Sequence, residues 1–255
     1  MNIHALISWY DEPDEWLQRA ILSIAPLVDH VIALDGRYRR FQPEAPASSP
    51  RSNREAIRQA CHAAGVELTM PEAQVWPTQC EKRTEMFRLA EQAGVVNTAE
   101  QRNGDWLLVI DADEYAIHLD AAPLRHALET TRSHTCMVGW EILEYDVSDD
   151  ELALQRCAVE ARRQRFRRRG IPQLYRLLPN MMVGPTHHWL YAADGYRGQR
   201  VALKGGRLQP GLRRYTTTSV APHLVMASDT LARSMDRKLV KADYYDERKR
   251  VGEDL

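Results

Sequence analysis

Features that are scarce in this chain of 255 residues exclude several classes of protein. The four cysteines are widely spaced and form no CxxC pair, which argues against a zinc site or a disulfide framework and favours buried, reduced thiols. The longest apolar runs, such as Trp106–Ile110, have the length of a strand, so no transmembrane segment is predicted. The amino terminus carries no basic segment, long apolar core or cleavage site of a secretory signal. We therefore expect a cytoplasmic protein.

Glycine is missing where a phosphate-binding loop would need it. Ser8–Pro13, the segment after the first predicted strand, contains none. A nucleotidyltransferase of the α/β class would need a glycine-rich loop there, because backbone N–H groups must approach the phosphates closely. The segment therefore argues against nucleotidyl transfer.

Enough apolar sequence is present for a single folded domain over residues 1–255. Hydrophobic residues make up 44% and charged residues 27% of the chain, values typical of a globular protein with a sizeable core. The net charge of −1 hides a division, because residues 1–150 carry 13 lysines and arginines against 25 acids and the remainder carries 21 against 10. A basic half often accompanies an anionic ligand or polymer, although two oppositely charged halves that pack together would give the same counts.

Strands and helices alternate through the first half of the sequence. The predicted strands are Ile3–Ser8, Val31–Leu34, Val66–Met70 and Asp105–Asp113. The predicted helices run from an N-cap at Asp11 to about Ile24, from Arg54 to Ala64 and from Thr78 to Ala93. Alternation of this kind predicts an α/β fold with a mostly parallel sheet covered on both faces. Beyond Asp120 we expect a helix to about Thr131, strands near Cys136–Ile142 and Gln173–Leu178, and a last helix from about Ser228 to Glu247.

Two aspartates follow the most apolar of the predicted strands. Asp111 and Asp113 stand at its carboxyl end, where ligands collect in open α/β sheets. Two carboxylates one residue apart can share a hard cation such as Mn²⁺ or Mg²⁺, and that cation would neutralise a diphosphate leaving group. A polar strand end or a helix N-cap would give the same tripeptide, so the context has to decide.

Four short segments supply that context. They are Tyr10-Asp11-Glu12, Val31–Gly36, Glu81-Lys82-Arg83 and Asp105–Glu114. In this order they resemble family 2 glycosyltransferases, which have an N-E-like turn, a strand ending V-D, a helix opening with K/R-R/N and a strand ending D-x-D-E. The resemblance covers roughly residues 3–116 and extends more thinly to the carboxyl terminus. This sequence departs from the family at Asp11, where Asn is usual, and at Gly36-Arg37-Tyr38, where a small Ser/Thr-rich segment is frequent.

The resemblance implies a GT-A fold with a nucleotide-sugar-binding part over about residues 1–116. An acceptor-side part with a carboxyl-terminal helix would occupy about residues 117–255. The donor would most readily be a UDP-sugar. Its binding residues would be Ser8, Tyr10 and Glu12 near the base and ribose, Asp35 on the base, and Arg83 and Asp111 near the diphosphate. The alternatives are a core aromatic at Tyr10 and a solvated helix charge at Arg83.

Histidines of the second half extend the resemblance toward the lipopolysaccharide-core-like branch of the family. Gln173–Leu177 and Thr186–Leu190 resemble its R-x-F/Y-R and V-H-E segments, with His187 on the family's histidine, at the acceptor, and His188 where Glu is usual. Many GT-A enzymes place a carboxyl-terminal histidine on the metal, so His223 is the candidate third ligand beside Asp111 and Asp113, and imidazole suits Mn²⁺. A buried, hydrogen-bonded histidine is the alternative at each position.

The general base of an inverting displacement should be a carboxylate or a histidine near the acceptor hydroxyl. Glu141, Asp146 and His188 are the candidates, and the sequence does not choose among them.

Arg162–Arg169 is the densest basic run, with six arginines in eight residues. Such runs suit phosphate-rich polymers or anionic membrane surfaces, which makes Arg165, Arg167 and Arg168 candidate acceptor contacts. An ordinary solvated face is the alternative.

Taken together, these patterns predict a metal-dependent, inverting glycosyltransferase that moves a sugar from a nucleotide sugar to a hydroxyl of an anionic acceptor. A cell-envelope saccharide or a lipid-linked acceptor is the first expectation. One alternative is a phage-type DNA glycosyltransferase acting on a hydroxylated base. Another is a non-catalytic nucleic-acid-binding protein, which would leave Asp111 and Asp113 unexplained.

Overall fold

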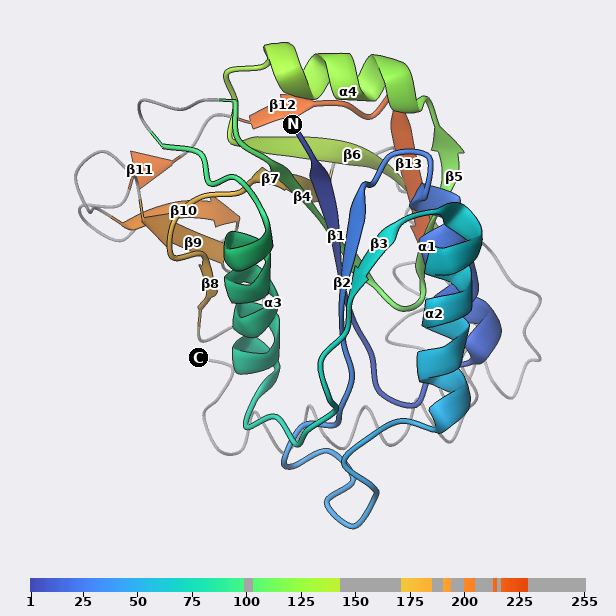
Figure 1. Ribbon diagram of the computed structural model, residues 1–255. Coiled ribbons are helices and arrows are strands. Elements are labelled where there is room, and N and C mark those ends of the chain that lie inside the picture. The colour runs from blue at the N-terminus through green and yellow to red at the C-terminus, as the bar shows by residue number, and fades with distance from the viewer. Residues whose placement is uncertain are drawn as a thin grey trace, which may run out of the picture.

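The computed structural model describes residues 1–98, 103–142, 171–184, 190–193, 200–204, 213–214 and 217–228 (Figure 1). The elements of the first half are β1 (Ile3–Ser8), α1 (Asp14–Ile24), β2 (His30–Leu34), α2 (Arg51–Ala64), β3 (Glu67–Thr69), α3 (Gln79–Ala93) and β4 (Trp106–Asp111). They are followed by β5 (Glu114–Leu119), α4 (Ala121–Thr130), β6 (Thr135–Ile142), β7 (Ile171–Arg176), β8 (Met182–Val183) and β9 (Leu190–Ala193). The last are β10 (Arg200–Lys204), β11 (Arg213–Arg214), β12 (Thr217–Ser219) and β13 (Leu224–Ser228).

The main sheet is mixed, with a parallel half that comes from the start of the chain. Its order is β3-β2-β1-β4-β7-β6-β13-β5, with β12 beside β6. Strands β3, β2, β1 and β4 are parallel, whereas β7 is antiparallel to both β4 and β6. Strands β8 to β11 form a second, smaller sheet. The predicted α/β fold with a mostly parallel sheet is confirmed.

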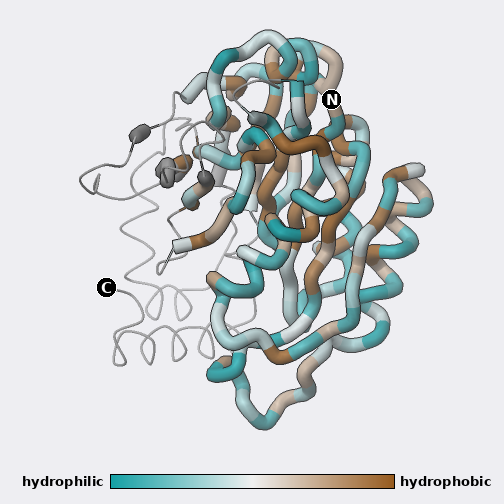
Figure 2. The backbone as a smooth tube through the Cα atoms, turned by 60° about the vertical axis from the view of Figure 1, so that its left-hand side comes forward, coloured by the Kyte–Doolittle hydropathy of each residue, from teal (hydrophilic) through white to brown (hydrophobic). Residues whose placement is uncertain are grey.

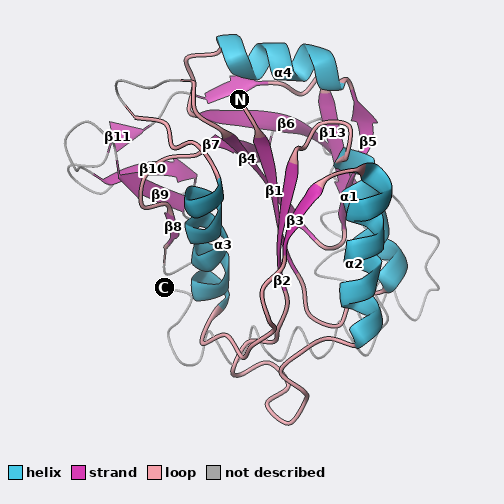
Figure 3. Cartoon of the chain, in the orientation of Figure 1, coloured by secondary structure: helices cyan, strands magenta, loops and turns pink. Residues whose placement is uncertain are grey.

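Helices cover both faces of this sheet (Figure 3). Along β1, Ile3, Ala5 and Ile7 belong to the core cluster that contains α1, α2 and α4, whereas Leu6 belongs to the cluster that contains α3. This follows from the strand geometry, because successive side chains point to opposite faces. Figure 2 shows the hydrophobic stretches gathered on the strands inside the molecule. A strand buried on both faces reads as a continuous apolar run, which is why β1, β2 and β4 could be predicted.

Local signals fix the ends of two helices. At the start of α3, the Thr78 hydroxyl accepts a hydrogen bond from the Glu81 N–H at 3.2 Å and donates one to the Glu81 carboxylate at 2.9 Å. Thr78 is therefore the N-cap of α3, and Glu81 stands at the position that a capping-box sequence gives to Glu. Helix α2 ends at Gly65, whose φ of 66° is the left-handed conformation that glycine adopts without strain.

Three sequence-based expectations need correction. The first helix begins at Asp14 with Pro13 at the N-cap position, because Asp11 adopts a φ of 51° and continues the turn after β1. Strand β5 was not expected, and β13 occupies the segment that was expected to lead into the last helix. These two strands pair with each other across more than 100 residues, so no local pattern announces them. Apart from Ser228, the range of the predicted last helix lies outside the described residues.

Candidate functional site

The carboxyl ends of three neighbouring strands meet at one edge of the main sheet. Ser8, the last residue of β1, is in register with Leu34 on one side and with Asp111 on the other. Asp35 follows Leu34 directly. Three of the predicted donor-binding residues are therefore brought to one edge by the parallel register alone.

The two aspartates lie at a tight turn between β4 and β5. Asp111 ends β4 with its side chain about half exposed, and Asp113 is buried and accepts a hydrogen bond from the Ser228 hydroxyl at 3.1 Å. The Arg83 guanidinium, from the first turns of α3, donates to the Asp111 carboxylate at 2.5 Å. The structure thus brings Arg83 to the turn that carries Asp111 and Asp113.

The Glu114 side chain is hydrogen-bonded to the backbone of this turn. One of its carboxylate oxygens accepts hydrogen bonds from the Asp111 N–H at 2.9 Å and from the Gln173 side-chain amide at 2.8 Å. Burial and, to a smaller extent, the neighbouring Asp111 and Asp113 carboxylates together raise the pKa of the Glu114 carboxyl to about 8. A carboxyl group that keeps its proton at neutral pH adds no third negative charge to the turn.

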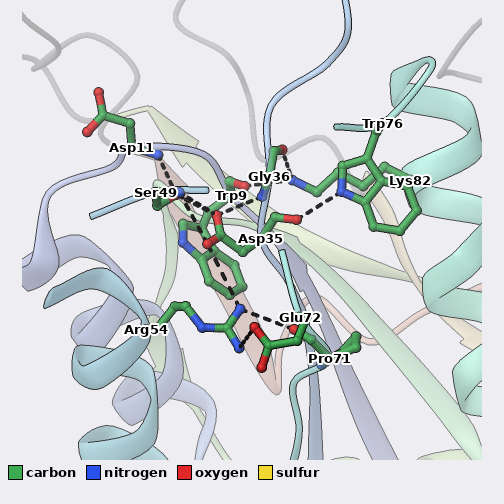
Figure 4. A network of polar contacts seen from close by, with 10 residues as sticks. All are labelled: Trp9, Asp11, Asp35, Gly36, Ser49, Arg54, Pro71, Glu72, Trp76 and Lys82. Carbon is green, nitrogen blue, oxygen red and sulfur yellow. Dashed lines mark hydrogen bonds and ion pairs between the residues drawn. The ribbon is translucent and has the colours of Figure 1, made fainter. Parts of the chain in front are cut away.

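The loop after β2 folds over Asp35 (Figure 4). The Asp35 carboxylate is buried, accepts hydrogen bonds from the Ser49 hydroxyl at 2.5 Å and the Gly36 N–H at 2.6 Å, and lies 4.0 Å from the Arg54 guanidinium. The Ser49 hydroxyl also accepts from the Asp11 N–H at 2.8 Å, which joins the loops after β1 and β2. Contact between Asp35 and a nucleobase would require Ser49 to leave the carboxylate.

Tyr10 and Glu12, the other residues predicted near the nucleotide, lie in the loop after β1. The Tyr10 hydroxyl donates to the Pro46 carbonyl at 2.8 Å, and its ring meets the Phe41 ring edge-to-face with centroids 6.1 Å apart. The Glu12 carbonyl accepts from the Asn53 side-chain amide at 2.8 Å. Tyr10 therefore packs against the loop after β2 and is not part of the main core.

His223 lies at the opposite end of its strand from the aspartates. Leu224, the next residue, is paired with Leu119, whereas Ser228 is paired with Glu114. Glu114 directly follows the turn that carries Asp111 and Asp113, called the DxD turn from here on. The four residue steps from Leu224 to Ser228 span roughly 13 Å of strand. The His223 carbonyl accepts a hydrogen bond from the Asp120 N–H at 2.8 Å. This corrects the assignment of His223 as a metal ligand.

No protein-family model matches the sequence. No characterised protein matches it significantly either. Among solved structures, the chain is similar to glucosyl-3-phosphoglycerate synthase from Mycobacterium tuberculosis, solved with Mn²⁺, UDP and phosphoglyceric acid. The identity is 16%, the TM-score 0.41, and the match covers 98% of this chain and 78% of that one.

Two other similar structures are more partial. TarS of S. aureus, solved with UDP-GlcNAc, is 13% identical with a TM-score of 0.40, over 58% of this chain and 37% of that chain. The mannosyltransferase PcManGT of Pyrobaculum calidifontis, solved with GDP-Man and Mn²⁺, is 14% identical with a TM-score of 0.37, over 54% and 35%. The match spans only 23% of the longer TarS chain. The function of this chain must therefore be argued from its own residues.

The donor set of the DxD turn fits a metal that arrives together with a nucleotide. Within the described residues there is no group of three or more His, Cys, Asp or Glu side chains that could hold a metal. Mg²⁺ in nucleotide sites is usually held by one or two carboxylates and by substrate phosphates, which complete the coordination sphere. Asp111 and Asp113 supply two such carboxylates.

Several predicted residues lie outside the described ranges. These are Asp146, His187, His188, Arg165, Arg167 and Arg168. The backbone of Glu141 lies on β6 opposite Ala227 of β13, one residue before Ser228, so it belongs to the same end of the sheet as the DxD turn.

Sequence reasoning missed four residues that contact the site: Lys82, Glu114, Gln173 and Ser228. Lys82, Glu114 and Gln173 stood within the quoted segments without an assigned role. Lys82 donates to the Trp9 and Gly36 carbonyls, at 2.6 and 2.7 Å. A lysine on the buried face of an amphipathic helix was the available signal for it. Gln173 and Ser228 come from β7 and β13, and their approach to the turn depends on tertiary structure alone.

Among the helices that the structure describes, none combines the length and the apolar character needed to cross a bilayer.

Proposed function

We propose that this chain is a metal-dependent, inverting glycosyltransferase that moves a sugar from a nucleotide sugar to an acceptor hydroxyl. The observation that carries the proposal is the DxD turn at the carboxyl end of β4, with the Arg83 guanidinium on Asp111. Beside it lie the ends of β1 and β2, where Ser8 ends β1, Tyr10 follows in the next loop and Asp35 follows β2. The neighbouring segments resemble family 2 glycosyltransferases, and we assign the chain to the lipopolysaccharide-core-like branch.

Arg83 and the two aspartates would have different roles toward the donor diphosphate. Asp111 and Asp113 would hold Mn²⁺ or Mg²⁺, which neutralises the leaving diphosphate as a Lewis acid when bound. Arg83 presents a forked set of N–H donors that matches phosphate oxygens, and its partner in this structure, Asp111, is the group that the metal would engage. Once the metal engages Asp111, the Arg83 guanidinium would be released from this carboxylate and could donate to the nucleotide phosphates instead.

The nucleoside end of a UDP-sugar would lie over the loops after β1 and β2. Tyr10 offers an aromatic ring to the base or ribose, and Glu12 lies two residues further along the same loop. Asp35 would accept from the base after Ser49 moves off its carboxylate. The closed loop therefore predicts that nucleotide binding reorders residues 37–50.

The acceptor side belongs to the ends of β6 and β13, next to the DxD turn. We assign the general base to one of Glu141, Asp146 and His188, and the acceptor contacts to His187 and to the arginine run. The base removes the hydroxyl proton as the oxygen attacks the anomeric carbon from the face opposite the diphosphate, which inverts its configuration. An anionic cell-envelope saccharide or lipid-linked acceptor suits the basic second half of the chain.

A thermal-shift panel of nucleotide sugars, with and without Mn²⁺, tests this proposal. A ligand that binds the native state stabilises it in proportion to ln(1 + [L]/Kd). We expect UDP-sugars to raise the unfolding temperature in Mn²⁺ and to raise it much less in EDTA. Equal melting curves with and without every nucleotide sugar would contradict the proposal.

The charge division and the run Arg162–Arg169 favour one second candidate, a glycosyltransferase that acts on a hydroxylated base in DNA. Replacing Arg165, Arg167 and Arg168 by Ala should then raise the KM for DNA and flatten its salt dependence. Each lost phosphate contact lowers the slope of log K against log[salt] by about 0.9. Salt-independent turnover on a neutral saccharide, unaffected by the triple replacement, would exclude this candidate.

A further inference from the structure

Lys82 is a buried cation whose donors point at two loops of the candidate site. It lies in the first turns of α3 with 1% of its surface exposed. Its ammonium donates to the Trp9 carbonyl at 2.6 Å and to the Gly36 carbonyl at 2.7 Å, and it lies 5.6 Å from the centre of the Tyr38 ring. Figure 4 shows this side chain reaching from the helix to the carboxyl ends of the strands.

The two carbonyls belong to the segments that would hold a nucleotide. Trp9 follows the last residue of β1 and precedes Tyr10, and Gly36 follows Asp35 at the end of β2. The next residue of α3, Arg83, donates to Asp111 at the end of β4. Two consecutive residues of one helix therefore hold the carboxyl ends of three parallel strands.

Burial of a lysine ammonium is costly, and hydrogen bonds to both carbonyls offset part of that cost. The aromatic face of Tyr38 adds a weaker cation–π contact. A structural role alone would need no charge, since a second anchor already holds this loop: the Trp76 indole N–H donates to the Asp35 carbonyl at 2.8 Å. The placement of a titratable cation between the two loops that would hold the nucleotide points to a functional role.

We propose that Lys82 is a positioning residue for nucleotide binding, whose ammonium fixes the Trp9 and Gly36 carbonyls and thereby places Tyr10 and Asp35 against the nucleoside. This inference rests on the proposed function. It adds a residue that touches neither the nucleotide nor the metal and acts through the two loops.

The surroundings of Lys82 make this hold sensitive to pH. Burial, with a smaller contribution from Arg83, lowers the pKa of its ammonium to about 7, although Asp35 and Glu12 oppose this shift. Below about pH 7 the ammonium offers three N–H donors and a positive charge to the two carbonyls and to Tyr38. Above it, the amine keeps two donors without the charge, so the hold on the loops weakens as the pH rises.

Three variants test the proposal by hydrogen exchange and nucleotide titration. Lys82→Met keeps the length and removes all donors, Lys82→Arg keeps a permanent charge, and Arg88→Met is the control on the exposed side of the same helix. In Lys82→Met we expect faster amide exchange in residues 9–12 and 36–38. The Kd for UDP or GDP with Mn²⁺ should rise about tenfold, which corresponds to one lost hydrogen bond to a charged group.

Lys82→Arg should bind nucleotide with a flatter dependence on pH between about 6 and 8.5 than the wild type, and Arg88→Met should match the wild type throughout. A folded Lys82→Met protein with unchanged loop exchange and unchanged Kd would overturn the role of Lys82 while leaving the proposed function intact. A wild type that binds neither nucleotide would overturn the proposed function and with it the nucleotide role. If Lys82→Met does not fold, comparison of the wild type with Lys82→Arg decides: the same dependence of Kd on pH in both proteins overturns the inference, and a flatter dependence in Lys82→Arg supports it.

Discussion

At the scale of single residues, the candidate site is a set of carboxylates held by partners from different elements. Arg83 of α3 binds Asp111, Ser228 of β13 binds Asp113, and Gln173 of β7 binds Glu114. Because each partner sits on a regular element, the turn that carries the aspartates is fixed from three directions. Its geometry should therefore be largely formed before a ligand binds.

Replacing Glu114 tests this arrangement. Glu114→Gln keeps an oxygen that can accept from the Asp111 N–H, and Gln173 can turn its amide to present its carbonyl. We expect it to cost less than about 1 kcal/mol of unfolding free energy. Glu114→Ala leaves the Gln173 amide buried without its acceptor and should cost about 2–3 kcal/mol. Urea denaturation of both variants measures the difference, and equal costs would contradict the assigned hydrogen bonds.

Gly36 is the second residue whose identity the structure explains. Its φ is 118°, and a Cβ there would lie 2.0 Å from the Gln74 carbonyl oxygen. Gly36→Ala should therefore cost about 2–4 kcal/mol and disorder the loop over Asp35. Gly65→Ala is the matched control: Gly65 also has a positive φ but no atom within 4 Å of the added Cβ among those the structure describes. We expect it to cost about 1–2 kcal/mol, and equal losses in the two variants would show that contact with Gln74 is unimportant.

At the scale of elements, the parallel strands are also joined at their amino ends by a buried hydrogen-bond chain. His4 of β1 contacts Asp105, just before β4, at 3.1 Å and His30 of β2 at 3.1 Å, and His30 contacts Thr69 of β3 at 2.9 Å. With both imidazoles neutral, one set of tautomers satisfies every contact: Thr69 donates to His30, His30 to His4, and His4 to Asp105.

This chain predicts a loss of stability in mild acid. Burial and the neighbouring His4 lower the pKa of His30, so the folded protein binds fewer protons than the unfolded chain below about pH 6.5. Stability should therefore fall as the pH drops through this range. His30→Asn, whose amide can replace the donor to His4, should lose stability at pH 7 and show a shallower acid dependence. Unfolding free energies at pH 5, 6, 7 and 8 test this, and parallel curves for the two proteins would contradict it.

The elements that could be predicted from the sequence are those with a local signal. Strands β1, β2 and β4 are continuous apolar runs, and α3 begins with Thr78 as its N-cap. Strand β5 is partly exposed, and its partner β13 comes more than 100 residues later, so both depend on tertiary pairing. His223 was assigned to the metal from sequence order alone. The pairing of β13 with β5 shows that it precedes β13 at the end of the strand away from the aspartates.

At the scale of the whole molecule, the first half of the chain supplies the proposed donor-binding residues, and the second half supplies strands that border them. Its first half forms the parallel strands whose ends carry Ser8, Asp35 and Asp111, and these could be aligned from the sequence because parallel strands end together. The second half contributes β6, β7 and β13, which border the DxD turn from the other side. Buried partners such as Lys82 and Gln173 could not be assigned, because their roles depend on which loops lie within reach.

The most direct test of the central claim is nucleotide release from a panel of UDP-sugars, measured with Mn²⁺ or EDTA, for the wild type and Asp113→Asn. The asparagine keeps the volume and an acceptor for the Ser228 hydroxyl but removes the charge that would hold the metal. We predict release in Mn²⁺ by the wild type, and release at the level of an enzyme-free control in EDTA or with Asp113→Asn, whose unfolding temperature should match the wild type. Metal-dependent release that is undiminished in a folded Asp113→Asn protein would contradict the account.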